Sequence, residues 1–329
     1  MLTSEKCLKL PELTISLDHS EGDLCFVSHA HSDHAAPLHS RKPVLASEET
    51  IAIAGSKKQP HSHIGCRLID AGHMLGAKQL VAEYDGGVFA YTGDLRLEAG
   101  LTSPPAKIPQ ADTVLIEGTY GSPEWKFPNR ELVFLQIEKW VSQNRGSNLI
   151  FGAYEVGKAQ EIVAFLNKYC SIVPLVTPRM DKICSIYEKF GVKLGRVNIE
   201  SLEGQEMLSH GFVALLPHNR VNFSLASTMK SAYGRDAKTA LVTGWALREQ
   251  FPVDRAFPLS DHVDFEGIVQ YLRESGAKRA VCTHGEEGVI AEHLRRAGFD
   301  AVALFELGQA RQLTLLSSEM GEKAQAPAL

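Results

Sequence analysis

Residues 24–34 read LCFVSHAHSDH, an apolar run followed at once by three histidines and an aspartate. Imidazole nitrogens and carboxylate oxygens are zinc ligands, and ligands this close in sequence can enclose one pocket with little loop-closure entropy. If His29 and His31 point the same way at the end of a strand, Asp33 and His34 on the following turn cannot easily reach the same ion. The spacing therefore predicts two adjacent metal ions. The alternative is a polar loop whose histidines contact solvent or backbone carbonyl groups.

The composition is that of a globular protein without a membrane segment. The chain has 329 residues, 44% of them hydrophobic and 22% charged, so one large domain or two closely connected domains can form. No apolar stretch approaches the roughly 20 residues that span a bilayer. Pro11 and Glu12 stand where a secretory signal would have its apolar segment, so we expect a cytoplasmic protein with no membrane partner.

The cysteines and the net charge exclude some classes of site. Six cysteines are spread along the chain without a C-x-x-C pair, which argues against a disulfide framework and against a zinc ribbon. The formal net charge is -5, so the chain as a whole does not attract a polyanion. Binding of a nucleic acid would therefore require a local basic groove or the metal ions themselves.

The pattern of apolar residues changes along the chain. Short apolar runs separated by turns predict strands at 24–27, 44–46, 67–70, 79–83, 88–91 and 113–116, with a Gly/Asp turn at 85–87. From residue 130 the pattern alternates between helix and strand, with helices at 130–143, 159–166 and 182–190 and strands at 148–151 and 172–176. After 240–243 short strand-like runs return, and a helix at 265–275 leads into a strand at 279–283. The middle part is thus predicted to be a parallel α/β unit inserted into its neighbour.

Three more polar residues follow predicted strands on glycine-bearing turns. His73 follows the segment LIDAG, Asp94 follows FAYTG, and His284 follows VCT and precedes Gly285. Functional side chains in α/β folds gather on such turns. Each residue alone could be an ordinary turn residue, but together with the histidines of 29–34 they are candidates to complete the metal site.

These segments resemble the motifs of a known superfamily. HAHSDH at 29–34, AGHMLGA at 71–77 and Gly93-Asp94 resemble the successive motifs of the metallo-β-lactamase superfamily. Further on, IEGTYG at 116–121, PLSDHVD at 258–264 and THGE at 283–286 resemble motifs A, B and C of its β-CASP branch, whose members cut nucleic acids. The resemblance runs from about residue 24 to the end of the ordered chain.

The resemblance implies an α/β fold in which both ends of the chain form an αββα sandwich and the middle forms an inserted α/β β-CASP domain. We expect the sandwich to comprise residues 1–121 and 241–318, and the insertion residues 122–240. Residues 319–329 are small, charged and proline-containing, and we expect them to be disordered.

The resemblance also implies a division of the ligands. One zinc ion would be held by His29, His31 and His73, the other by Asp33, His34 and His284, with Asp94 bridging the two; manganese could substitute for zinc. Two ions roughly 3.5 to 4 Å apart can activate water and stabilise charge on a phosphate. Asp33 is therefore also a candidate catalytic residue.

Four residues outside the ligand set are expected to contribute to catalysis or to substrate binding. We expect His262 to contact the phosphate and to donate a proton to the leaving oxygen, with Glu117 orienting it. Ser260 is a candidate phosphate contact. FGAYEVGK at 151–158 ends a strand and opens a helix, so its backbone N–H groups and Lys158 could hold a phosphate, although a lysine at a helix start is commonly solvated.

Several functions remain open at this stage. GKAQ at 157–160 and TGW at 243–245 resemble compact bacterial DNA-ligase-associated exonucleases, which implies a DNA substrate and repair or ligase partners. His284 in motif C instead resembles RNA-acting members such as RNase J and the nuclease of mRNA 3′-end cleavage, because the crosslink-repair DNA nucleases carry valine there. A small-molecule thioester or lactone hydrolase and a non-catalytic binding paralogue are further alternatives. The insertion argues against the hydrolase, and the complete ligand set against the paralogue.

Overall fold

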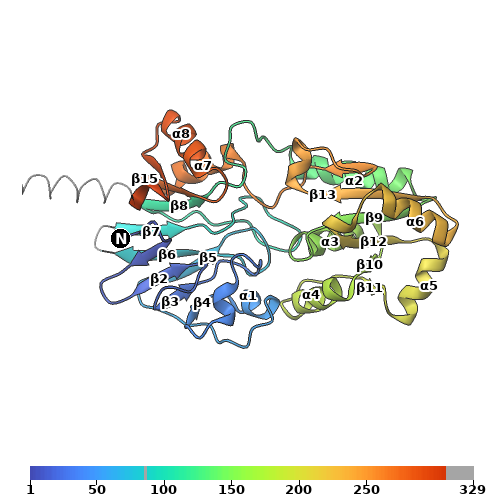
Figure 1. The fold of residues 1–329 in the computed structure, drawn as a ribbon, viewed down its shortest axis with the longest axis horizontal. Coiled ribbons are helices and arrows are strands. Elements are labelled where there is room, and N and C mark those ends of the chain that lie inside the picture. The colour runs from blue at the N-terminus through green and yellow to red at the C-terminus, as the bar shows by residue number, and fades with distance from the viewer. Residues whose placement is uncertain (85–86, 309–329) are drawn as a thin grey trace, which may run out of the picture.

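A computed structural model of the chain describes residues 1–84 and 87–308. Figure 1 shows two lobes side by side, one formed by both ends of the chain and one by its middle part. We call the first the core lobe and the second, residues 130–257, the inserted lobe. The expected disordered tail at 319–329 and residues 85–86 of the expected turn lie outside the described residues. None of the helices in the described part of the chain is long and apolar enough to cross a membrane.

The core lobe contains two sheets packed face to face. The smaller has the order β1(Cys7–Lys9), β2(Thr14–Leu17), β3(Leu24–Phe26), β4(Val44–Leu45). The larger has the order β16(Ala301–Ala303), β15(Arg279–Thr283), β8(Thr113–Glu117), β7(Gly87–Tyr91), β6(Lys78–Tyr84), β5(Cys66–Asp70). Between them lies a core to which Ile15 and Phe26 contribute from one sheet and Leu80, Tyr91 and Leu115 from the other. Strands buried on both faces are apolar almost throughout, which is why they appear in the sequence as continuous apolar runs.

Helices cover the outer face of each sheet. α7(Phe265–Ser275) and α8(Glu287–Arg296) pack on the larger sheet, where Tyr271 and Leu294 share an apolar core with Val114 and Ile116. α1(Glu48–Ile53) and the 3-10 helix η1(Ala36–His39) pack on the smaller one. The layers are therefore helix, sheet, sheet, helix, which confirms the expected αββα sandwich.

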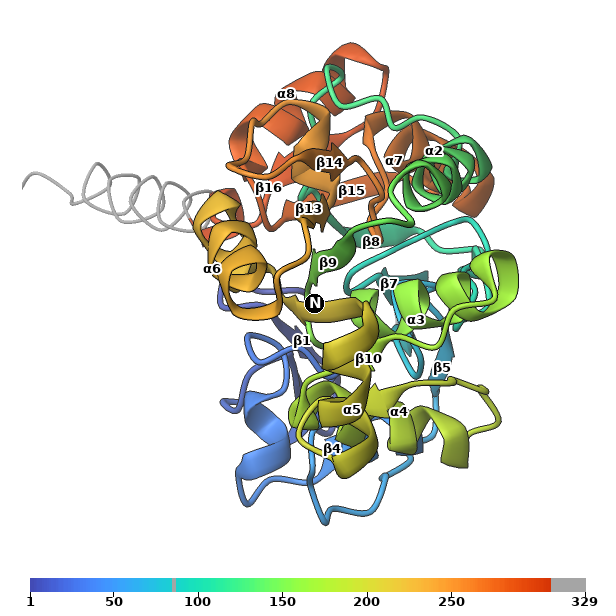
Figure 2. The same cartoon turned by 90° about the vertical axis from the view of Figure 1, so that its right-hand side faces the viewer.

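The inserted lobe is a doubly wound parallel sheet. Its order is β11(Val197–Asn198), β10(Leu175–Val176), β12(Val213–Pro217), β9(Asn148–Ala153), β13(Ala237–Val242), β14(Arg255–Phe257), and every pair is parallel. α2(Arg130–Gln143), α3(Lys158–Cys170) and α4(Pro178–Lys189) pack on one face. α5(Leu202–His210) and α6(Phe223–Tyr233) pack on the other. Figure 2 shows these helices on both sides of the sheet.

The inserted lobe extends further than the expected boundary at residue 240. That boundary cuts through β13, whose residues Ala240 to Val242 pair with β14. The segment 241–257 therefore belongs to the inserted sheet. The sequence pattern missed this because β14 is a three-residue edge strand beginning with an arginine, too short to show a period.

Local signals explain the elements that the sequence predicted well. The helices expected at 130–143 and 265–275 and the strand expected at 279–283 have the observed bounds of α2, α7 and β15. Asp264 caps α7 by accepting a hydrogen bond from the Gly267 amide, and Gly276 ends the helix in the left-handed conformation. The shorter strands β1 and β2 and the helices α5, α6 and α8 were not anticipated.

Candidate metal centre and active site

The candidate ligands meet at one edge of the core lobe because of how its strands pair. β5, β7, β8 and β15 run in the same direction, so the residues after their carboxyl ends, among them His73, Asp94 and His284, lie along one edge. His73 and Asp94 each follow a glycine with positive φ, +81° at Gly72 and +53° at Gly93. A Cβ atom at Gly72 would lie 1.9 Å from the Arg96 carbonyl oxygen, so only glycine allows the chain to turn there.

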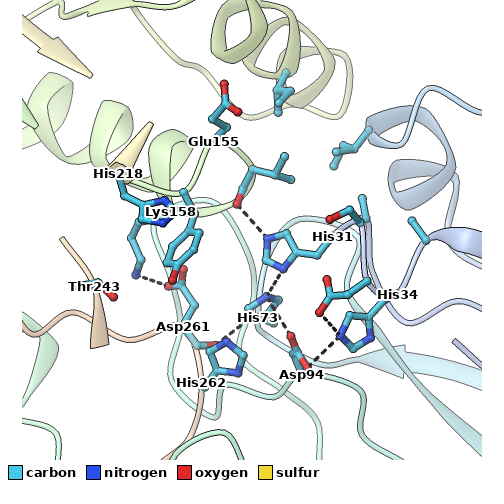
Figure 3. A pocket seen from close by; sticks show the side chains of 18 of the residues that line it. His31, His34, His73, Asp94, Glu155, Lys158, His218, Thr243, Asp261 and His262 are labelled. Atoms are coloured by element: carbon cyan, nitrogen blue, oxygen red, sulfur yellow. Dashed lines mark hydrogen bonds and ion pairs between the residues drawn. The ribbon is translucent and has the colours of Figure 1, made fainter. Parts of the chain in front are cut away.

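Four side chains form a first donor set. His29 Nε2 lies 2.9 Å from His31 Nδ1 and 3.3 Å from Asp94 Oδ2, and His73 Nε2 lies 3.3 Å from His31 Nδ1 and 3.7 Å from Asp94 Oδ2. Ligands about 2.05 Å from a tetrahedral zinc ion are roughly 3.3 Å apart. The donor atoms therefore have the spacing of a tetrahedral site. Figure 3 shows three of the four side chains, His31, His73 and Asp94.

Hydrogen bonds at the other ring nitrogens orient these imidazoles. His31 Nε2 donates to the Val156 carbonyl oxygen at 3.1 Å, and His73 Nδ1 donates to that of Asp261 at 3.0 Å. A carbonyl oxygen only accepts, so the nitrogens that face the donor set carry lone pairs. Burial lowers the pKa of His29, of His31 and of His73, the last to about 3, so all three rings are neutral near pH 7. Buried lone pairs aimed at one another require a cation between them, which fits a divalent metal.

A second donor set shares Asp94 with the first. Asp94 Oδ1 lies 3.7 Å from His34 Nε2 and 3.8 Å from His284 Nδ1, while Oδ2 faces the first set. Asp33 stands at the mouth of this set: its Oδ2 lies 3.4 Å from His34 Nε2, and its side chain is 76% exposed. The hydrogen bond with His34 lowers the pKa of Asp33 to about 2. The structure thus gathers the seven candidate ligands, six closely and Asp33 at the rim.

Asp18 supports the second donor set and was missed by the sequence analysis. Its Oδ2 accepts hydrogen bonds from His34 Nδ1 at 2.8 Å, Ser28 Oγ at 2.9 Å and Tyr91 OH at 2.6 Å. Burial disfavours the protonated form of His34, but the Asp18 carboxylate outweighs it and raises the pKa of His34 to about 11. A metal bound at Nε2 would therefore displace a proton. The signal available in the sequence was a carboxylate directly after β2, where apolar and hydroxyl residues alternate.

His262 lies beside the first donor set with Glu117 behind it. Its ring centroid is 4.6 Å from that of His73, and its Nδ1 donates to Glu117 Oε1 and Oε2 at 2.9 and 3.0 Å. Glu117 is fully buried and also accepts from the Leu95 amide and the Thr119 hydroxyl. Burial opposes protonation of His262, but Glu117 outweighs it and raises the pKa of His262 to about 9. His262 is therefore an imidazolium at neutral pH, as a proton donor must be.

Lys158 and Ser260 have partners within the protein. The Lys158 ammonium lies 2.7 Å from Asp261 Oδ1 and 3.7 Å from Glu161 Oε2, and only 3% of the side chain is exposed. A substrate phosphate would have to compete with both carboxylates for it. Ser260 Oγ donates to the His262 carbonyl oxygen and accepts from the His262 amide, each at 2.9 Å. The hydroxyl thus shapes the turn that presents His262, and it lines the cavity described next.

The Lys158 pair belongs to a charge network that joins the two lobes. Asp261 Oδ1 also lies 3.0 Å from an Arg96 nitrogen of the core lobe, and Glu161 on α3 pairs with Arg130 of α2 at 2.7 Å. All five side chains are buried or nearly so. The network surrounds Asp261, whose carbonyl oxygen accepts the hydrogen bond of His73. The geometry of one metal donor is therefore tied to the contact between the lobes.

A cavity of about 1020 Å³ opens in front of both donor sets. One wall is the core-lobe edge with its histidines, and the other is the carboxyl edge of the inserted sheet. That second wall comprises the residues that follow β9, β12, β13 and β14, among them Tyr154, His218, Thr243 and Ser260. Open α/β sheets bind ligands at this edge. A ligand in the cavity would contact both lobes.

Metal binding should be visible as a gain in stability. Zinc added to chelator-treated protein at 100 times its Kd stabilises the folded state by about 2.7 kcal/mol per site, so we expect Tm to rise by several degrees. His73→Ala, which removes one donor of the first set, should reduce the rise. A Tm that does not respond to zinc, measured by differential scanning calorimetry, would contradict the metal-site interpretation.

Comparisons with known proteins find relatives over most of the chain, although no family model matches it. The chain is 30% identical to a probable DNA ligase of Opitutus terrae, covering 92% of this chain and 31% of that protein. It is 29% identical to an RNase J-like protein of Methanocaldococcus jannaschii (46% and 37% covered) and 22% identical to the 5′ exonuclease Apollo of Gallus gallus (76% and 56%). The chain thus spans between about a third and just over half of the length of these relatives.

The fold also has a counterpart among solved structures. A protein of unknown function from Enterococcus faecalis V583 superposes with a TM-score of 0.59 at 14% identity, over 85% of this chain and 78% of that one. At that identity the likeness concerns the fold alone. The relatives above, together with the motifs in their order, lead to one conclusion: the chain belongs to the β-CASP branch of the metallo-β-lactamase superfamily.

Proposed function

We propose that the chain is a metal-dependent nuclease that hydrolyses phosphodiester bonds with two zinc ions, acting as a DNA exonuclease. The observation that carries this proposal is the Asp94 carboxylate, which faces one donor set with each oxygen while His262 stands beside the first set. Two metal sites sharing a ligand next to a proton donor suit displacement at phosphorus. His262 lines the same cavity as the members of both donor sets, apart from His29, which is fully buried behind them.

The residues of this chain supply positioning and a proton. Divalent ions bound to the two donor sets would lower the pKa of water and neutralise charge on a phosphate. Asp94 and the histidines hold that charge in place, and Asp18 fixes the ring of His34 through Nδ1. His262, protonated through its bond to Glu117, donates to the phosphate and then to the leaving oxygen. The second nitrogen of His262 is left for the substrate, because Nδ1 is bound to Glu117.

The relatives favour a nucleic acid as the substrate but differ on whether it is DNA or RNA. The probable DNA ligase favours DNA, and the 5′ exonuclease Apollo favours exonucleolytic cutting. Similarity to part of a ligase favours a ligase or another repair protein as partner. The RNase J-like relative and His284 at the position of motif C favour the second candidate, an RNA-processing nuclease. A small-molecule hydrolase is disfavoured, because such a substrate needs only the metal edge of the core lobe, whereas this cavity has a second wall from the inserted lobe.

The test is hydrolysis of end-labelled single-stranded DNA and RNA by the purified full chain loaded with zinc or manganese. We expect mononucleotides from DNA, and internal fragments would instead indicate an endonuclease. His34→Ala should abolish the activity, whereas His210→Ala, at an exposed histidine on α5, should not change it. Protein that binds metal yet cuts neither polymer would refute the nuclease proposal, and cleavage of RNA alone would select the second candidate.

The role of Glu117 predicts a pH dependence. A raised pKa means that His262 carries its proton below about pH 9 and loses it above, so kcat/KM should fall on the alkaline side of that value. Glu117→Gln removes the stabilising charge, and the fall should move towards the ordinary histidine pKa of about 6.5. Glu131→Gln, at an exposed position of α2, is the matched control. If the alkaline fall of kcat/KM occurred at the same pH in Glu117→Gln as in the native chain, Glu117 would not be the group that holds the proton on His262.

A further inference from the structure

Two aromatic side chains lie together on the inserted-lobe wall of the cavity. Tyr154 follows β9 and His218 follows β12, and these parallel neighbours end in register at Ala153 and Pro217. The pairing brings the two rings to a centroid separation of 4.3 Å with 39° between their planes. Both residues line the cavity that holds the metal donors. Figure 3 shows His218 across the pocket from His34, with His31 and His73 between them.

The two rings contact each other but lie outside the apolar cores and the polar networks of the described residues. Tyr154 is 41% exposed although it lies in the wall of a cavity, and neither ring belongs to a hydrophobic core cluster of the described residues. Within that same part of the chain neither side chain has a hydrogen bond or an ion pair to another residue. Burial lowers the pKa of His218, so its ring is neutral at pH 7. The pair is therefore open to a ligand on the side that lines the cavity.

Cationic side chains stand on the same wall. Arg179 and Lys182 lie in the first turns of α4 and line the cavity. The Arg179 side chain is 70% exposed, with its Nε 3.6 Å from Glu155. Exposed cations of this kind can follow a phosphate backbone. Stacking rings beside cations are the combination by which proteins hold single-stranded nucleic acid without regard to sequence.

We propose that Tyr154 and His218 form a stacking subsite for one unpaired nucleobase of the strand whose phosphate lies at the metal centre. The inference rests on the proposed nuclease function and deepens it. A paired base keeps both of its faces stacked in the duplex, so the subsite selects a single strand or a frayed end. Every base offers a π face, and the subsite therefore tolerates any sequence.

The test uses single-stranded DNA and RNA oligonucleotides that carry 2-aminopurine near either end, mixed with the zinc-loaded full chain in a stopped-flow instrument. Fluorescence in the first milliseconds reports stacking before turnover, and anisotropy reports affinity. We expect quenching with the native chain and with Tyr154→Phe, which keeps the ring. Tyr154→Ala should lose the quenching and bind about 5- to 150-fold more weakly, the usual cost of one base–aromatic stack. Tyr169→Ala, at a tyrosine of α3 that is 45% exposed, is the matched control.

An oligonucleotide with an abasic nucleotide provides a second test of the subsite. Removing the base from the quenched position should weaken binding to the native chain by the same factor and should not weaken binding to Tyr154→Ala further. Equal losses in both proteins, or quenching that survives Tyr154→Ala, would overturn the subsite. A native chain that binds the strand without quenching would refute the subsite alone. A native chain that binds neither DNA nor RNA would refute the nuclease function and the subsite with it.

Discussion

Asp94→Ala is expected to abolish both metal binding and hydrolysis. Its two oxygens face the two donor sets separately, so one substitution removes a ligand from each. Charge stabilisation by a metal is worth several kcal/mol, and 1.36 kcal/mol is a factor of ten in rate, so activity should fall by at least about 1000-fold. Metal content by mass spectrometry and hydrolysis of labelled DNA measure the two effects in the same preparation.

The Asp94 prediction has a direct counter-outcome. Loss of one metal equivalent with the other retained at native affinity would show that the carboxylate serves one set only. Asp236→Ala removes an exposed carboxylate whose partner is Lys230 in the inserted lobe, and we expect no change in metal content or rate. Thermal unfolding of each variant distinguishes loss of a ligand from loss of the fold.

Asp261→Ala should be among the most destabilising single substitutions in the chain. Its carboxylate lies among Lys158, Arg96 and Arg130, with Glu161 the other anion of the network. Without Asp261 three buried or nearly buried cations would share one carboxylate. Breaking a buried ion pair from one side costs about 3–5 kcal/mol, because it leaves charge uncompensated. We expect a fall of that size in the free energy of unfolding, measured by urea denaturation.

The Asp261 effect should extend to the active site. The same residue accepts the hydrogen bond of His73 through its backbone, so a loosened network should also weaken zinc affinity. Glu124→Ala breaks the exposed pair with Arg248 and should change neither quantity. If Asp261→Ala unfolded at the same urea concentration as the native chain, the network would contribute no net free energy to the contact between the lobes.

The sequence was informative where the signal is local. Residues 29–34 carry four candidate ligands in six positions, and His73, Asp94 and His284 each follow an apolar run on a glycine-bearing turn. Strand ends and ligand types can be seen within a few residues. The resemblance of these motifs to a known superfamily then implied the sandwich that the structure confirms. Long amphipathic helices such as α2 and α7 were predicted with their bounds for the same reason.

The sequence did not reveal contacts between side chains that lie far apart along the chain. Asp18 reaches His34 from the preceding strand, and Lys158 finds Asp261 across the lobe contact. The solvated lysine that a helix start suggests is instead a buried ion pair. The end of the inserted lobe was misplaced for a related reason: β14 joins its sheet only through pairing with β13. The periodicity of apolar residues within a short segment does not show which strands pair.

By itself the sequence determined the ligand types, their order along the chain and the family to which they point. Only the tertiary structure decided that Asp94 faces two donor sets, that Glu117 holds the proton on His262 and that Tyr154 lies against His218. The physical reason is that hydrophobic periodicity and ligand type are properties of a few neighbouring residues, whereas these contacts depend on strand direction and register. Direction and register are set by the packing of the whole sheet.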